Sequence, residues 1–152
     1  MSILRGVTTQ TGADAFTQTI IDTNLTADGK AGWEVLSFRA FWPGFYLLAA
    51  ADMTLSAILS TQATTVTTLN QAAEIARVNW AIANTAGVAV AFPVDQVKND
   101  VLIEPRITAQ PLLYVSVSSA TTGGTNAVYW ELEYNIVKLS DVETLRLLVG
   151  GA

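Results

Sequence analysis

Two carboxylates, Glu131 and Glu133, lie two residues apart in AVYWELEYNIVKL, the aromatic-rich segment from residue 127 to 139. On a strand, side chains with this spacing share one face and lie roughly 6.5 to 7 Å apart. That separation is near the distances between the paired carboxyl groups of glycosidases. The opposite face is apolar and holds Val128, Trp130, Leu132, Tyr134 and Ile136. A strand with one apolar face usually turns the other to solvent or to a neighbouring subunit, so the pattern permits catalysis but favours a structural role.

Neither cysteine nor histidine occurs in the chain. Their absence removes disulfides, thiol nucleophiles, thiolate metal sites and every Ser-His-Asp or Cys-His arrangement. It also removes the side chain that most often titrates near neutral pH. We therefore predict that the protein is not an enzyme and has no catalytic residues, no metal site and no cofactor.

The charge balance is acidic, with 8 basic and 13 acidic residues and a net charge of −5. The lysines and arginines are scattered singly along the chain. Binding to a phosphate backbone needs several cations that converge on one surface. We predict no direct, sequence-specific contact with nucleic acid.

The segment PVDQVKND, residues 93 to 100, carries oxygen ligands of the kind that calcium prefers, on Asp95, Asn99 and Asp100. The spacing lacks the order of an EF-hand loop, and Lys98 lies among the candidate ligands. The sequence therefore favours a solvated polar loop over an ion site in residues 95 to 100.

Six of the thirteen aromatic residues lie between residues 33 and 46. In the segment from 33 to 42, strict alternation would put Phe38 and Trp42 on one face and Trp33 and Phe41 on the other, so both faces carry aromatics. The cluster FWPGFY (41–46) follows, and its proline and glycine predict a bend that projects large rings toward a partner subunit or a lipid surface. Exposed tryptophans would instead form a platform for sugar binding, which is the alternative that we keep.

Most of the chain shows a period of two that is broken by turn residues, which is typical of an antiparallel all-β domain. Residues 72 to 83 fit a helix or a strand, and we prefer a strand followed by a hairpin to VAVAF (88–92). The Gly123-Gly124 pair has no phosphate-loop pattern, so we predict a hairpin loop over residues 119 to 126. The expected strands are at 16–24, 33–42, 45–60, 72–83, 88–92, 101–107, 112–119 and 127–139.

The end of the chain predicts a helix over residues 140 to 149. Ser140 and Glu143 form a capping box, in which each side chain satisfies a free backbone N–H group at the helix start. The apolar stripe is expected to include Val142, Leu145, and either Leu148 or Val149. A helix of this length is too short to be stable alone, so it must pack on the β domain or on a neighbour.

The longest apolar run, residues 40 to 51, is interrupted by Pro43 and Gly44 and is too short to cross a bilayer. The first twelve residues lack the apolar core and the cleavage site of a signal peptide. We therefore expect synthesis in the cytoplasm and a chain that does not span a membrane by itself.

The strands LLYVSVSSATTGGTN and AVYWELEYNIVKL and the tail LSDVETLRLLVGGA, taken with the high apolar fraction, resemble the single jelly-roll capsid or virion-shell proteins of icosahedral viruses. The resemblance implies an all-β, single jelly-roll antiparallel sandwich of about eight strands with a short C-terminal helix, in one domain over residues 1–152. It implies a homo-oligomer that self-assembles through its β domain, an N-terminal arm (1–12) and the helix (140–149), located in the virion and made in the host cytoplasm. The expected interface residues are Phe41, Trp42, Phe45, Tyr46, Val142, Leu145 and Leu148.

One feature departs from that family. Many jelly-roll coats that contact their genome have a basic N-terminal arm, whereas residues 1–12 hold only Arg5. The resemblance then implies that a second virion protein or an internal viral membrane is a further partner. A carbohydrate-binding β-sandwich and a phage decoration or tail-associated protein remain the alternatives.

Overall fold

The strands pair in a nested order along the chain, the first with the last and so on inward. This computed structural model describes residues 1–25, 30–43, 52–63, 73–82, 84–85, 88–89 and 97–150. Its elements are β1 (Ser2–Thr9), β2 (Thr17–Asp22), β3 (Ala31–Phe41), β4 (Met53–Ser60), β5 (Glu74–Ile82), β6 (Asn84–Thr85), β7 (Val88–Ala89), β8 (Val97–Thr108), β9 (Leu112–Ala120), β10 (Ala127–Lys138) and α1 (Asp141–Gly150). β1 pairs with β10, β2 with β9, β3 with β8 and β4 with β5, all antiparallel.

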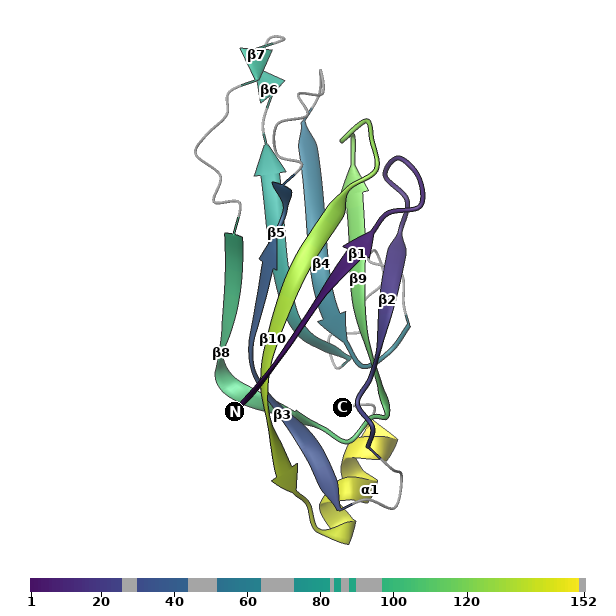
Figure 1. The fold of residues 1–152 in the computed structure, drawn as a ribbon, viewed down its shortest axis with the longest axis vertical. Coiled ribbons are helices and arrows are strands. Elements are labelled where there is room, and N and C mark those ends of the chain that lie inside the picture. Colours follow the sequence, from purple (N-terminus) through teal and green to yellow (C-terminus); the bar gives the residue numbers. More distant parts are fainter. Residues whose placement is uncertain are drawn as a thin grey trace.

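Two four-stranded sheets face each other, in the orders β1-β10-β3-β8 and β2-β9-β4-β5. Successive nested pairs alternate between the two sheets, and this strand order is that of a jelly roll. The prediction of an all-β antiparallel sandwich of eight strands with a short C-terminal helix is confirmed. Figure 1 shows α1 at the lower end of the sandwich and the small β6-β7 pair at the upper end.

Several expected segments are placed differently. Residues Ser2–Thr9 of the expected arm form edge strand β1. Residues Val97–Asp100, expected as a loop, begin β8 because the end of β3 offers them a pairing partner. The loop after β9 is not a hairpin loop, since β9 and β10 lie in opposite sheets.

The preference for strand over helix in residues 72 to 83 is confirmed by β5. The hairpin expected between this strand and residues 88–92 is different: Asn84 and Thr85, expected in its turn, form β6 and pair with Ala89 and Val88 of β7. The partner of β5 itself is β4.

A β-bulge in β3 explains why aromatics occur on both of its predicted faces. Ser37 lies opposite Glu133 and Val35 opposite Tyr134, so Leu36 is an extra residue in the pairing with β10. An extra residue reverses the alternation along a strand. The core therefore receives Trp33 and Val35 before the bulge, and Phe38, Ala40 and then Trp42 after it.

The core between the sheets contains all four tryptophans and Phe38 among aliphatic side chains. Trp42 meets Trp80 edge-on, with ring centroids 6.0 Å apart, and Trp33 stacks on Tyr134 at 3.7 Å. The indole N–H of Trp42 donates to Asn126 Oδ1 at 3.1 Å. Burial of an indole with its N–H group bonded contributes apolar area without leaving a donor unsatisfied.

The capping box of α1 forms as predicted. Glu143 Oε2 accepts the backbone N–H of Ser140 at 2.8 Å, and Ser140 Oγ accepts that of Glu143 at 3.3 Å. Lys30, the residue before β3, forms an ion pair with Asp141 over 3.3 Å, which ties the start of the helix to the start of β3.

Candidate functional site

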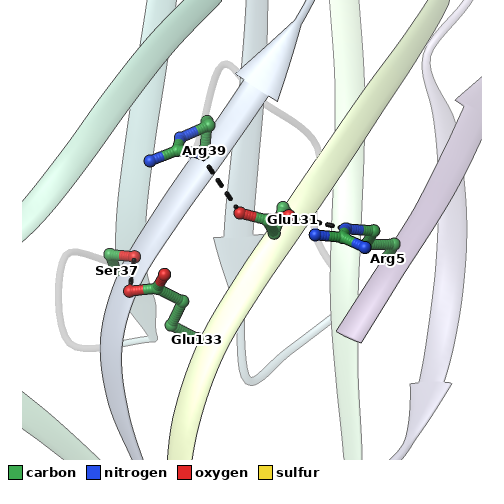
Figure 2. Close-up of polar contacts among 5 residues, drawn as sticks. All are labelled: Arg5, Ser37, Arg39, Glu131 and Glu133. Carbon is green, nitrogen blue, oxygen red and sulfur yellow. Dashed lines mark hydrogen bonds and ion pairs between the residues drawn. The ribbon is translucent and has the colours of Figure 1, made fainter. Parts of the chain in front are cut away.

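The two glutamates of the central motif project from the outer face of β10. Figure 2 shows Glu131 between two arginines, one from each neighbouring strand. Arg5 Nε donates to Glu131 Oε2 at 2.6 Å, and Arg39 Nη1 lies 3.3 Å from Oε1. All three residues are directly opposite one another in the pairing of β1, β10 and β3. This triad, Arg5–Glu131–Arg39, consists of two cross-strand ion pairs that share one carboxylate and link three strands.

The second glutamate has a different partner. Ser37 Oγ donates to Glu133 Oε2 at 2.9 Å, and the two residues are opposite each other on β3 and β10. Figure 2 shows the carboxylate of Glu133 turned toward Ser37 and that of Glu131 turned toward the arginines. The two carboxylates thus bind separate groups of the sheet instead of facing a common point, which supports the structural interpretation of the motif.

An open hollow of about 230 Å³ lies beside the triad, and its lining includes Glu131 but not Glu133 among the described residues. Its aromatic lining residues are Phe41, Tyr129 and Trp130, and the ring centroids of Phe41 and Tyr129 are 6.3 Å apart. Tyr129 is 51 % exposed. An aromatic face beside guanidinium and carboxylate groups can stack on a ring and hydrogen-bond its substituents.

The expected interface residues divide into three groups. Trp42 is only 1 % exposed and belongs to the core, which corrects its assignment to a surface contact. Phe45 and Tyr46 lie outside the described residues, and Phe41 lines the hollow. On α1, Val142 and Leu145 are exposed and Leu148 is half-buried.

The tryptophans do not form an exposed platform. Each of the four is at least 95 % buried, because the bulge in β3 and the inward faces of β5 and β10 turn their rings into the core. A sugar site made from tryptophans therefore has no counterpart on the described surface.

The side chains of the three candidate ion ligands lie outside what the structure describes. Asp95 lies beyond the described residues, and Asn99 and Asp100 are described only as part of strand β8. In the described part of the chain, no three acidic side chains gather closely enough to hold a metal ion.

A polar network at the upper end of the sandwich was not anticipated from the sequence. Asp14 Oδ1 accepts hydrogen bonds from Ser119 Oγ at 2.7 Å, from Thr122 Oγ1 at 2.7 Å and from the Thr122 backbone at 3.1 Å. Gln10 Oε1 accepts from Asn126 Nδ2 at 2.7 Å. These bonds join the loop after β1 to the loop after β9, across the two sheets.

The network also sets the charge state of its carboxylate. Burial raises the pKa of the Asp14 carboxyl, but the hydrogen bonds from Thr122 and Ser119 outweigh it and hold the pKa below its ordinary value. The only signal in the sequence was a set of turn-forming residues in two loops, and nothing there indicated that the loops meet.

Comparison with protein-family models finds no match for the chain, and comparison with curated proteins finds none either. Within the described residues, no helix has the length and apolar character of a membrane span.

Proposed function

We propose that this protein is a structural subunit that self-assembles into a virion shell and catalyses no reaction. The jelly-roll strand order supports this proposal because shells are often built from such sandwiches. The same fold occurs in lectins and other proteins, so the surface must carry the argument.

The observation that carries the proposal is the amount of large apolar surface that the sandwich leaves open. Ile20 on β2 and Ile136 on β10 are each more than 60 % exposed, as are three apolar residues of α1. Scattered single apolar residues are ordinary on a monomer, but a set that includes a whole helix stripe marks a contact surface. Contacts between copies of the subunit would remove these apolar side chains from water.

The basic residues support a shell subunit that does not bind the genome directly. Four of them, Arg5, Lys30, Arg39 and Arg77, form ion pairs with carboxylates of their own chain. Cations that are already paired contribute less to binding a phosphate backbone. We therefore propose that a second virion protein or an internal membrane lies between this subunit and the genome.

The test is the mass distribution of the purified full chain, measured by light scattering over a wide concentration range and followed by negative-stain microscopy. Closed particles or regular capsomers are expected. A single species of 16.2 kDa at every concentration would overturn the proposal.

The hollow beside the triad favours a second candidate function, binding of a glycan. Tyr129 offers an exposed ring, and Arg39 and Glu131 offer a donor and an acceptor at its edge. Saturation-transfer NMR with a panel of sugars tests this function, with Tyr129→Ala as the variant and Ile20→Ala, on the other sheet, as the control. Loss of transfer in the first variant alone would support glycan binding, and no transfer to the original chain would exclude it for the sugars used.

A further inference from the structure

The outer face of the first sheet carries an aromatic row directly beside a charged row. Tyr129 lies opposite Phe41, and Glu131, two residues further along β10, lies opposite Arg39. Arg5 continues the charged row onto β1, where it lies opposite Glu131. Residues two apart on a strand share a face and lie roughly 6.5 to 7 Å apart. A single ring can therefore lie on the aromatic row while one of its substituents reaches the charged row, and both rows line the hollow of about 230 Å³.

The charged row has far more hydrogen-bond donors than acceptors. A guanidinium group has five N–H donors. Within the part of the chain that the structure describes, Arg5 and Arg39 each use one of these donors, and both bonds go to Glu131. Each carboxylate oxygen of Glu131 is already engaged by one of the two bonds. Two cations are thus balanced by one anion, and the row suits a ligand that brings a negative charge and several acceptors.

The unused donors are accessible, whereas the carboxylate is largely covered. The side chains of Arg5 and Arg39 are 73 % and 49 % exposed, and that of Glu131 is 17 % exposed. Figure 2 shows the two guanidinium groups on opposite sides of Glu131. A ligand that approaches from solvent therefore meets the guanidinium groups more readily than the carboxylate. Because the ion pairs already restrict both arginines, a ligand has less side-chain freedom to remove when it binds.

The chemistry of the two rows indicates the class of ligand. A carboxylate matches the planar fork of a guanidinium group and accepts two parallel hydrogen bonds from it. The faces of Tyr129 and Phe41 are electron-rich, so they attract the weakly positive C–H groups of a sugar ring. The hydroxyl groups of a sugar can accept the remaining N–H donors, which an aromatic carboxylate cannot do. The hollow is smaller than the roughly 300 to 1,000 Å³ of pockets for drug-sized ligands, so it fits one ring.

We propose that this hollow binds a sugar ring that carries a carboxylate, such as a uronic acid. The C–H face of the ring lies on Tyr129 and Phe41, and its carboxylate binds Arg39, the arginine next to Phe41 on the same face of β3. Arg5 lies two strands away from Arg39 and contributes charge. This inference rests on the second candidate function, glycan binding, and names the class of glycan.

The test compares glucuronate with its uncharged methyl ester, at equal ionic strength, in saturation-transfer NMR titrations of the full chain. This method works for single subunits and for large particles alike. One ring on an open surface should bind with a dissociation constant of about 1 mM. Glucuronate should bind about 10-fold more tightly than the ester, because a hydrogen bond to a charged group contributes about that factor. The preference should shrink at high salt, which screens exposed charges.

Three variants separate the roles of the two rows. Arg39→Gln should abolish the preference for glucuronate over the ester, because Arg5 and Glu131 then balance each other. Tyr129→Ala should weaken the binding of both probes alike. Glu131→Gln should strengthen the binding of glucuronate about threefold at low salt, since it removes a negative charge roughly 7 Å from the ligand. A purely structural role of Glu131 predicts no such gain, and Ile20→Ala on the other sheet is the control for all three.

The outcomes distinguish this inference from glycan binding as such. Equal affinities for glucuronate and the ester would overturn the selection of a carboxylate and leave glycan binding in place. Saturation transfer to neither probe, and to no neutral sugar, would contradict both. Benzoate that binds as tightly as glucuronate would overturn the preference for a sugar, and acetate that does so would show a site for any small anion.

Discussion

Replacing Gly6 by alanine should destabilise the sandwich, although such a change is often favourable. Gly6 on β1 lies opposite Trp130 on β10. A Cβ atom on Gly6 would lie 2.6 Å from Cη2 and 2.8 Å from Cε2 of the Trp130 indole, and closer still to its Cζ2. The indole is buried and donates a hydrogen bond from Nε1 to Thr8 Oγ1 at 3.2 Å, so it cannot move aside without losing that bond.

Two opposing terms set the magnitude. Alanine restricts the unfolded chain more than glycine does, which favours the variant by about 0.4 to 1 kcal/mol. Forcing a methyl group into a packed core costs about 1 to 3 kcal/mol, and a lost indole hydrogen bond adds about 1 kcal/mol. We expect a net loss of about 1 to 3 kcal/mol, which for a chain of this length lowers Tm by about 2 to 12 °C.

Thermal and urea unfolding, followed by circular dichroism at one protein concentration, measure this loss. Gly12→Ala is the matched control, because its Cβ atom would lie 3.9 Å from the Cβ of Ala15 and meet only ordinary contact. That control should be neutral or slightly stabilising. In a Trp130→Phe background the Gly6→Ala change should cost less, since the benzo ring is gone. A Gly6→Ala variant as stable as the original chain would refute the described packing of β1 on Trp130.

Three further predictions concern the polar contacts. Asp14→Asn should remove part of the dependence of stability on pH: the folded pKa of Asp14 lies below the ordinary value of 3.8, so its stabilisation is present above that pH and is lost as the pH falls through the folded pKa. Urea midpoints at a series of pH values test this, and an equal difference between the two proteins at all pH values would contradict it. Asn126→Ala should cost about 1 to 3 kcal/mol, because the buried indole N–H of Trp42 loses its acceptor, whereas Gln10 Oε1 loses one donor and keeps the backbone N–H of residue 126; a loss below about 0.5 kcal/mol would show that water replaces the lost acceptor. Glu131→Gln should cost less than about 1 kcal/mol, because both arginines that it contacts are largely exposed, and the difference should shrink at high salt.

The sequence predicts the fold class well because alternation and turn residues are local signals. It does not predict which residues of β3 face the core, since the extra residue Leu36 is recognisable only once the partner strands are known. Strict alternation put Trp33 and Val35 opposite Phe38 and Ala40, whereas the bulge brings all four into the core. Alternation also assigned Ile136 to the apolar face of β10, whereas its side chain is 67 % exposed.

The outer-face triad shows the same limit for the candidate site. Glu131 was recognised from its spacing to Glu133, but its partners Arg5 and Arg39 lie far away in sequence and looked like isolated charges. Pairing register decides which charges meet across strands, and register follows from the nested topology of the whole sandwich. The helix and its capping box were predicted correctly because every residue that they need lies within one turn.

The two ends of the sandwich differ in what they leave unsatisfied. At the upper end, Gln10, Asp14 and Asn126 bond to groups of their own chain, so these three side chains have little to offer a partner. At the lower end, the stripe on α1 would release ordered water on meeting a second apolar surface. Val149→Ser should therefore reduce the assembly seen in light scattering while the urea midpoint of dilute protein stays unchanged. Asn126→Ala should instead lower the urea midpoint of dilute protein. If Val149→Ser lowers the midpoint as much as Asn126→Ala does, the stripe stabilises its own subunit, and the assembly contact must be sought on the sheet faces.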